Sequence, residues 1–569
     1  MAVLDWIVLI GTLLFIVGFG VWKTRGSKNV EDYLRGGQTK WWTIGLSVMA
    51  TQASAITFLS TPGQAFHDGI GFVQFYFGLP LAMVAICLIF IPIYHKLKVY
   101  TAYEMLEERF DLKTRTLTAI LFLIQRGLAA GITIFAPSII LSAVLGWDLR
   151  TLNIIIGILV IVYTVTGGTK AVNITQKQQM FVIMLGMFIA FFFILGSLPT
   201  DISFGEALKI AGANGKLEIL NFEFDTQNRY TFWSGITGGF FLALAYFGTD
   251  QSQVQRYLSG KNIRESQLGL IFNGIFKIPM QFFILLVGVM VFVFYQYNPS
   301  PLHFNPAANE AVKASEAAED FSVLEENHHT LEREKRMAQN DFVTALKLKD
   351  YNAIEQAKIN LSAVNKKELD NREAARTLIE NSVSNAETND KDYVFIHFIL
   401  NNLPRGFIGL LLAVILSAAM SSTASELNAL GTITALDLFR VHENNSENDK
   451  PKNYVRATKT FTLLWGIIAI FIACIANLFD NLIQLVNIIG SIFYGNVLGI
   501  FLLAFFFKYI KGNAVFLAAL ITQIIVILGW YQDWMSYLWL NAFGCALVMA
   551  LAFLLEILDR TLLRPPIKA

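Results

Sequence analysis

The chain is predicted to be an all-α polytopic membrane protein with about 13 transmembrane helices. Of its 569 residues, 54% are hydrophobic and only 15% are charged, whereas soluble domains contain roughly 25% charged residues. Many segments reach the roughly 20 apolar residues that a spanning helix needs. Such continuous segments favour helices over a membrane β-barrel, whose strands alternate between apolar and polar residues.

The predicted spans follow one another along the chain with a single long interruption. The first begins close to Met1 and lacks a basic leader, so we interpret it as a membrane span rather than a cleaved signal. The spans are predicted at residues 3–22, 41–60, 72–95, 115–144, 151–166, 172–198, 231–250, 266–298, 405–436, 457–478, 481–507, 512–530 and 537–558.

Lys and Arg residues gather in alternate loops. The basic clusters lie at residues 23–40, 96–115, 256–264 and 440–456. The loops at 61–71 and 531–536, on the opposite side, contain no Lys or Arg. Because short cytoplasmic loops carry the excess of basic residues, we expect the N-terminus outside and the C-terminus in the cytoplasm, in the plasma (inner) membrane.

The long interruption is a polar insert at residues 301–392. It contains 18 acidic and 12 basic residues and falls on the predicted outer side. Apolar residues recur at helical spacing, among them Phe342 in its first half and Ile359, Leu361 and Leu369 in its second. We predict a helical hairpin with one apolar seam that turns near residues 349–352. The alternative is a solvated charged spacer.

Two stretches of small polar residues interrupt predicted spans. Met49–Thr57 is a place where a helix can unwind, and Ser417–Asn428 is rich in hydroxyls. Transporters use carbonyls of such broken helices to coordinate sodium, a hard cation that prefers oxygen ligands. Carbonyls of Ala50 and Ala53, with hydroxyls from the second stretch, would form a neutral cage. The alternative is hydroxyls that bond back to their own packed helix.

The main ionisable residues within predicted spans are Arg126, Asp250, Lys277 and Glu426. Such residues are costly in a membrane and mark functional sites by default. The alternative is an internal polar bond that joins two helices. Asp250 and Lys277 lie in consecutive spans, so we expect these two side chains to converge.

Five motifs, in this order, resemble the sodium/solute symporter family. They are Trp41-Trp42, Leu97–Phe110, Thr166–Val172, Gln251–Tyr257 and Ser421–Ser425. The resemblance covers nearly the whole chain except the insert. It implies a five-plus-five inverted-repeat core of the leucine-transporter type, flanked by extra spans.

The resemblance also implies site residues. Five positions match the main sodium site of the family: Ala50, Ala53, Ala418, Ser421 and Ser422. Five more match positions at or near its substrate pocket: Thr57, Tyr246, Asp250, Lys277 and Asn487. Tyr246 corresponds to an aromatic residue that closes the pocket from inside, and Lys277 to a lysine that contacts substrate in sugar-transporting members. Thr57 departs from the Gln of those members, and Gln251–Tyr257 resembles the branch carrying iodide, monocarboxylates and vitamins.

Gln176 is the other departure from the family pattern. Many members carry an Asp at this point of the sixth span, where its carboxylate supports sodium binding. A neutral amide can orient a ligand but supplies no charge, so we interpret Gln176 as the remnant of a second ion site.

The expected function is sodium-coupled secondary active symport of a small polar organic solute, of the sugar or carboxylate class. The alternatives are a sodium-coupled anion or vitamin transporter and a solute sensor that does not transport. No enzyme activity is expected, because no nucleophile–base set, metal-ligand cluster or phosphate loop is present. Sodium is the expected coupling ion, with no other metal and no organic cofactor.

The expected partners are the solute and the lipid bilayer. The insert is expected either to dock a protein partner or to shield the entrance. A net charge of +1 gives no basis for a nucleic-acid partner. The chain is divided into a first helix and loop (1–40), the first part of the core (41–300), the insert (301–392), the rest of the core (393–507) and two peripheral helices with a short tail (508–569).

Overall fold

The structure is a computed structural model that describes residues 2–24, 39–97, 99–383, 388–439, 450–476 and 482–560. Its regular elements, over these residues, are helices, with one isolated bridge between Thr39 and Gly260. Part of the orientation prediction rests on residues outside the described ranges, namely Arg25, Lys28, Arg35, Lys98 and Arg440.

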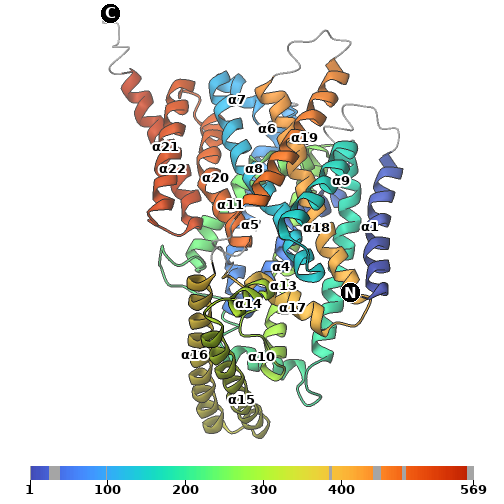
Figure 1. Cartoon of the computed structure of the whole chain (residues 1–569). Coiled ribbons are helices and arrows are strands. Elements are labelled where there is room, and N and C mark those ends of the chain that lie inside the picture. Colours follow the sequence, from blue (N-terminus) through green and yellow to red (C-terminus); the bar gives the residue numbers. More distant parts are fainter. Residues whose placement is uncertain are drawn as a thin grey trace, which may run out of the picture.

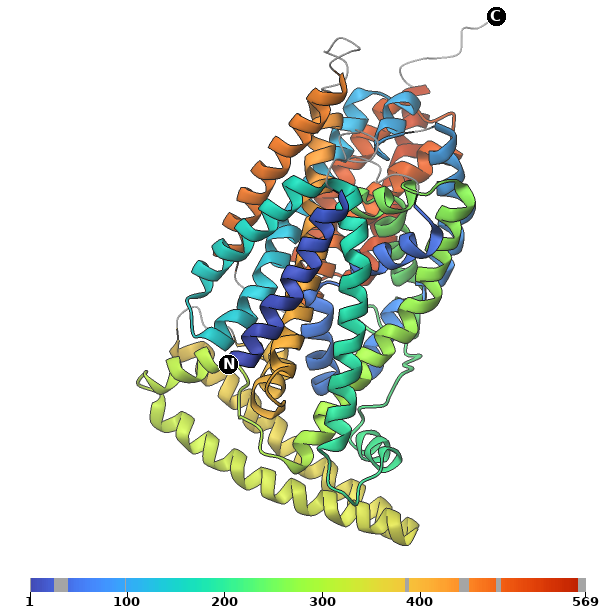
Figure 2. The ribbon, with the colours of Figure 1, turned by 90° about the vertical axis from the view of Figure 1, so that its right-hand side faces the viewer.

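The helices form one bundle with a hairpin across one of its ends (Figures 1 and 2). The bundle contains α1 (Val3–Thr24), α3 (Trp41–Gln52), α4 (Ala55–Asp68), η1 (Ile70–Tyr76), α5 (Leu79–Ala85), η2 (Ile86–Phe90), α6 (Ile91–Leu97), α7 (Glu104–Arg109), α8 (Leu112–Leu145), α9 (Leu149–Gly196), η3 (Ser234–Gly238), α11 (Gly239–Gly248), α12 (Gln251–Leu258), α13 (Ile263–Tyr297), α18 (Phe407–Ile433), η4 (Thr434–Leu438), α19 (Lys450–Ile475), α20 (Leu482–Phe506), α21 (Gly512–Tyr531) and α22 (Tyr537–Leu558). At the hairpin end lie α10 (Phe204–Ala213), α14 (Pro306–Lys313), α15 (Ala318–Leu348), α16 (Tyr351–Ser382) and α17 (Lys391–Asn402).

The apolar helices coincide with the predicted spans. Among the described residues, nine helices are long and apolar enough to cross a membrane, or ten if the bent pair α3 and α4 is one span. Three shorter apolar helices, Val3–Ile16, Leu149–Val162 and Ser234–Gly248, fall on the remaining predicted spans. The all-helical membrane class is therefore confirmed, whereas the count of thirteen crossings stays a prediction.

Helix α9 contains two predicted spans in one stretch of helical backbone. Residues 151–166 and 172–198 were expected as separate helices, yet the backbone is helical from Leu149 to Gly196. Figure 2 shows this turquoise stretch turning back at the end of the bundle away from the hairpin, so that its apolar parts, Leu149–Val162 and Thr175–Gly196, run in opposite directions. The helical geometry continues through what the sequence suggests is a loop.

The span predicted at residues 41–60 is broken, as its small polar residues suggested. Helix α3 ends at Gln52 and α4 begins at Ala55, with a bend of 61° between them. Ser54 is extended, with ψ of 174°. Since no β-branched or large side chain stands between Ala53 and Ala55, the break costs little packing. It falls at the middle of the bundle.

The insert contains a helical hairpin made by α15 and α16. Lys349 takes a left-handed conformation (φ 56°) at the turn, and the Asp350 carboxylate caps α16 by accepting from the amides of Asn352 and Ala353 at 3.0 and 3.1 Å. Such caps satisfy backbone donors at a helix start. Over the described residues the insert is therefore a helical hairpin with its turn at the predicted position, not a solvated spacer.

The seam of the hairpin differs in part from the predicted one. Phe342 and Leu361 are buried as expected, but Ile359 and Leu369 are 62% and 64% exposed. Ile359 lies two residues, or about 200°, from the buried Leu361 and therefore on the opposite face of α16. Next to Leu369, a charge pair lies between the two helices: Lys335 of α15 is 2.5 Å from Glu368 of α16.

Candidate ion and solute site

The break between α3 and α4 turns two backbone carbonyls away from helical partners. The Ser54 amide donates to the Gln52 carbonyl at 3.0 Å rather than to that of Ala50. The Thr57 amide donates to the Ser54 carbonyl at 3.0 Å rather than to that of Ala53. Ala50 and Ala53 are fully buried. A carbonyl at this depth needs another donor or a cation, because no bulk water is available.

Two predicted sodium ligands meet across the boundary between α3 and α18. The Ser421 hydroxyl donates to the Ala50 carbonyl, with 3.4 Å between the oxygens. The Ser422 hydroxyl bonds back to the Ala418 carbonyl of its own helix at 3.0 Å. These groups are neutral oxygens, which suits a hard monovalent cation. Ala50, Ala418, Ser421 and Ser422 are thus brought together, and Ala53 lies at the break itself.

Gln176 of α9 fills the space next to this group. Its side-chain nitrogen donates to the hydroxyls of Thr51 and Ser425, each at 3.0 Å, and lies 3.5 Å from the Ser421 carbonyl. Its side-chain oxygen accepts from the Ser47 hydroxyl. The amide therefore joins α3, α9 and α18, and its N–H groups point at oxygens that would otherwise face a cation.

A small cavity of about 90 Å³ lies beside the break. It is lined by four of the predicted residues, namely Thr57, Tyr246, Ser422 and Asn487, together with Arg126. Helices α4, α8, α11, α18 and α20 supply these side chains. The candidate sodium ligand Ser422 is thus part of the wall, so an ion and a solute would bind next to each other.

Asp250 and Lys277 do not converge, contrary to the sequence expectation. Asp250 instead accepts from the guanidinium of Arg126 and from the Tyr494 hydroxyl, the latter at 2.9 Å. Arg126 also donates to Glu426 at 3.0 Å. The Asp250 carboxylate also caps α12 by accepting from the Ser252 amide at 2.9 Å. We call Arg126, Asp250, Glu426 and Tyr494 the Arg126 cluster.

Lys277 and Asp250 are not among the residues that line the cavity. The Lys277 ammonium is buried behind Tyr76, 5.7 Å from the centre of that ring, and makes no hydrogen bond to any described residue. Of the predicted substrate residues, the geometry therefore groups Thr57, Tyr246 and Asn487.

Side-chain contacts join the helices around the cavity. The Arg126 guanidinium packs 5.4 Å from the centre of the Tyr246 ring, and both residues line the cavity. Toward the hairpin, Gln484 of α20 donates to Gln64 of α4 at 3.3 Å and accepts from Arg229 at 2.5 Å. These contacts connect α8 to α11 and α20 to α4.

Sequence reasoning did not place Arg126, Glu426 or Tyr494 at the cavity. Arg126 and Glu426 could be recognised as functional candidates, since they are ionisable residues inside predicted spans, but nothing in the sequence says that they share one wall. Tyr494 could not be recognised, because a single aromatic residue in an apolar span usually serves only to pack the core.

A model of the sodium:solute symporter family matches residues 33–321 and 375–522. The match covers more than half of the chain, so the chain belongs to the sodium:solute symporter family, which is a family of transporters rather than enzymes. The unmatched residues between the two parts, 322–374, comprise most of the α15–α16 hairpin.

Relatives in this family transport different solutes. The chain is 31% identical over 291 residues to the sodium/iodide cotransporter of Homo sapiens, covering 50% of this chain and 44% of that protein. It is 25% identical over 512 residues to the sodium-coupled monocarboxylate transporter 1 of Xenopus laevis, covering 89% and 68% respectively. The chain thus spans less than half the length of the first of these relatives.

A solved structure supports the fold. The structure of a Na⁺-coupled sialic acid symporter, substrate-bound and outward-open, superimposes with a TM-score of 0.74 and 23% identity, covering 98% of both chains. At this identity the likeness shows the architecture alone, which is the predicted leucine-transporter type.

Proposed function

We propose that this chain couples sodium entry to the uptake of a small carboxylate-bearing solute by alternating access. The observation that carries the proposal is the pairing of the Ser421 hydroxyl with the Ala50 carbonyl at a break in α3–α4, directly beside a cavity. Membership of the family and the activities of its relatives support it.

Sodium would be held by the carbonyls of Ala50, Ala53 and Ala418 and the hydroxyls of Ser421 and Ser422. This set joins the broken helix to α18, so ion binding would favour the conformation in which the two lie together. Coupling between ion and solute is then a difference in affinity between two conformations, typically about 1–3 kcal/mol.

The solute would meet two buried atoms of opposite polarity. Arg126 Nε and Glu426 Oε2 belong to residues that line the cavity, and neither has a hydrogen-bond partner among the described residues. A buried polar group without a partner is costly, so a solute with an acceptor beside a donor would satisfy both. A carboxylate with a neighbouring hydroxyl has this arrangement.

The charge of the Arg126 cluster favours binding of sodium first. Asp250 and Glu426 carry two formal negative charges against one on Arg126. A sodium ion beside Ser422, one helical turn from Glu426, would balance the excess negative charge.

The same excess negative charge favours a second candidate solute, a neutral polyol or sugar, which would not need a sodium ion for charge balance.

We also propose an orientation of the chain in the membrane. The start of α1 and the hairpin lie at the same end of the bundle, and α22 ends at the other (Figure 1). With the hairpin outside the cell, this agrees with an outer N-terminus and a cytoplasmic C-terminus in the plasma membrane. The divisions at residues 40, 300, 392 and 507 remain part of the proposal, and no comparison supports a protein partner for the insert.

Thermal stabilisation of the purified protein tests the solute class, because a ligand that binds only the folded state raises its stability. We expect lactate to raise the melting temperature in sodium buffer and to have a much smaller effect in potassium buffer. Glucose serves as the neutral competitor. A shift with glucose and none with lactate would favour the second candidate over the first.

A further inference from the structure

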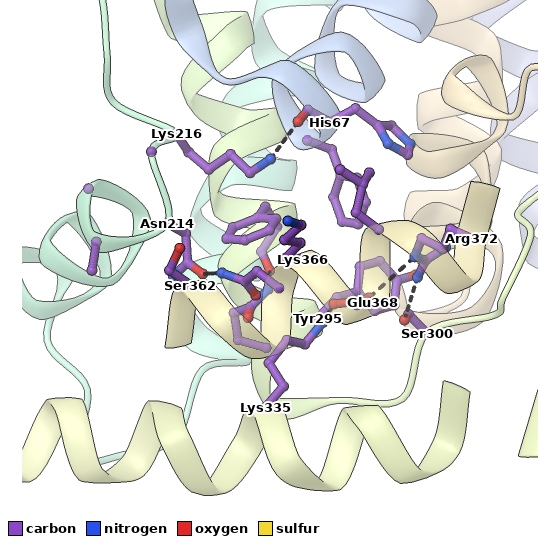
Figure 3. Close-up of a pocket in the computed structure, with 18 of the residues that line it drawn as sticks. His67, Asn214, Lys216, Tyr295, Ser300, Lys335, Ser362, Lys366, Glu368 and Arg372 are labelled. Atoms are coloured by element: carbon purple, nitrogen blue, oxygen red, sulfur yellow. Dashed lines mark hydrogen bonds and ion pairs between the residues drawn. The ribbon is translucent and has the colours of Figure 1, made fainter. Parts of the chain in front are cut away.

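A second, larger cavity lies between the hairpin and the core. It has a volume of about 570 Å³ (Figure 3), within the range of cavities that bind organic ligands. One wall is α16 of the hairpin, and the others come from the ends of α4 and α13 and from the segment after α10. Seven of its lining residues belong to the stretch 322–374 that the family model does not match. The hairpin wall of this cavity is thus built by a stretch that distinguishes the chain from the family model.

Cationic side chains dominate the lining. Its charged members are Lys216, Lys335, Lys366 and Arg372 against Glu218 and Glu368. Glu368 is occupied, since it pairs with Lys335 at 2.5 Å and with Arg372 at 3.2 Å. Lys366 makes no hydrogen bond or ion pair to any described residue, and Figure 3 shows its side chain extending into the cavity. The lining therefore has a net formal charge of +2, with one ammonium free to meet a ligand.

The wall opposite α16 presents a lysine beside aromatic rings. The Lys216 ammonium donates to the His67 carbonyl at 2.5 Å and lies 4.7 Å from the centre of the Phe292 ring. Burial lowers the pKa of Lys216 to about 8, so it is mostly charged at neutral pH and would gain from an anion nearby. Phe66 and Tyr295 complete an aromatic surface on this side.

We propose that this cavity is a binding site for an aromatic carboxylate. The carboxylate would lie between Lys366 of α16 and Lys216 of the core, with its ring against Phe66 and Phe292. Ammonium groups bind carboxylates through charge-assisted hydrogen bonds, and aromatic rings attract one another in edge-to-face or offset-stacked arrangements. Such a ligand would connect the hairpin to the core, and its binding requires neither sodium nor the transported solute.

The test uses the full-length protein in sodium-free buffer, with benzoate as the probe and thermal stabilisation as the readout. Benzyl alcohol supplies the ring without the charge, and sulfate supplies charge without the ring. The variants are K366Q and K216Q, and the matched control is K367Q, the next residue of α16, which does not line the cavity and lies 3.4 Å from Glu334.

We expect benzoate to stabilise the protein saturably, and benzyl alcohol and sulfate to do so far less. A lost charge-assisted hydrogen bond should raise the apparent dissociation constant about tenfold in K366Q and in K216Q, and less than about twofold in K367Q. An equal effect of benzyl alcohol, an equal effect of sulfate, or an unchanged dissociation constant in K366Q would each overturn the proposal. Because Lys366 is exposed, K366Q should fold normally. Failure of the benzoate test would not count against the proposed transport function, because the effect of lactate is measured separately, in sodium buffer.

Discussion

The side-chain nitrogen of Gln176 lies 3.0 Å from the hydroxyl of Ser425 and bridges α9 to α18. The same nitrogen donates to Thr51 of α3 at 3.0 Å. An N–H donor therefore stands where oxygens from three helices converge. A donor satisfies these oxygens without an ion, so we propose one sodium site in this region rather than two.

Replacing Gln176 with Asp should create a second ion site. The variant Q176D removes the donor and adds a negative charge beside the Thr51 and Ser425 hydroxyls. We expect sodium-dependent uptake in proteoliposomes to change from a Hill coefficient near one to a value clearly above one. A wild-type coefficient near two would contradict the single site, and Q176N, which keeps the amide, serves as the control.

Removing the charge of Glu426 should make solute binding less dependent on sodium. In E426Q the Arg126 cluster is formally neutral before sodium binds, so an anionic solute no longer needs the ion for charge balance. We expect the ratio of lactate affinities with and without sodium to fall several-fold, as measured by thermal stabilisation. The control Y494F alters the same cluster without changing its charge and should keep the wild-type ratio; a fall of equal size there would count against the electrostatic explanation.

Breaking the Lys335–Glu368 pair should destabilise the hairpin locally. The variant E368Q leaves the Lys335 ammonium, whose side chain is 5% exposed, without its partner, a loss of about 3–5 kcal/mol for a buried pair. Hydrogen exchange over residues 318–382 of the full-length protein measures the effect. The matched control is E355Q, which breaks an exposed pair with Lys358 and should cost less than about 1 kcal/mol.

The Lys335–Glu368 pair should also make the stability of the hairpin depend on pH. Burial alone would raise the pKa of Glu368, but Lys335 and Arg372 hold that pKa well below its ordinary value of 4.5. The pair therefore contributes its full stability above about pH 4.5 and loses it as the pH falls toward the pKa of the folded state. The difference in protection between wild type and E368Q should shrink from pH 5 to pH 3; a constant difference would mean that the pair is not the cause.

Shortening the hairpin should preserve transport. Asn371 donates to the Leu324 carbonyl at 3.0 Å, so the two arms are adjacent there, and the apolar base formed by Phe321, Ala375 and Ile379 stays intact. We expect a variant with residues 325–370 replaced by four Gly/Ser residues to keep sodium-dependent uptake and lose benzoate binding. Lost uptake in a well-folded variant would show that the hairpin takes part in transport itself.

The sequence predicts the membrane class, the broken span and most of the hairpin, because each depends on local composition. The break at Ala53–Ser54 follows from small residues in an apolar span. The Arg126 cluster could not be predicted, since Arg126 and Tyr494 are 368 residues apart and only the packed bundle brings them together. For the same reason Lys277 is buried behind Tyr76 rather than facing Asp250. The Lys335–Glu368 pair between α15 and α16 could not be predicted either, because apolar periodicity alone does not reveal an ion pair.

The measurement that tests the account most directly is binding of ²²Na⁺ to the purified protein, because it requires no knowledge of the solute. Wild type should bind one sodium ion saturably, and the double variant S421A/S422A should show no saturable binding. The control T423V removes a hydroxyl of the same helix that bonds back to Ala419 at 2.9 Å and should bind sodium as wild type does. Unchanged sodium affinity in the folded double variant would contradict the assignment of Ala50, Ser421 and Ser422 to the ion site.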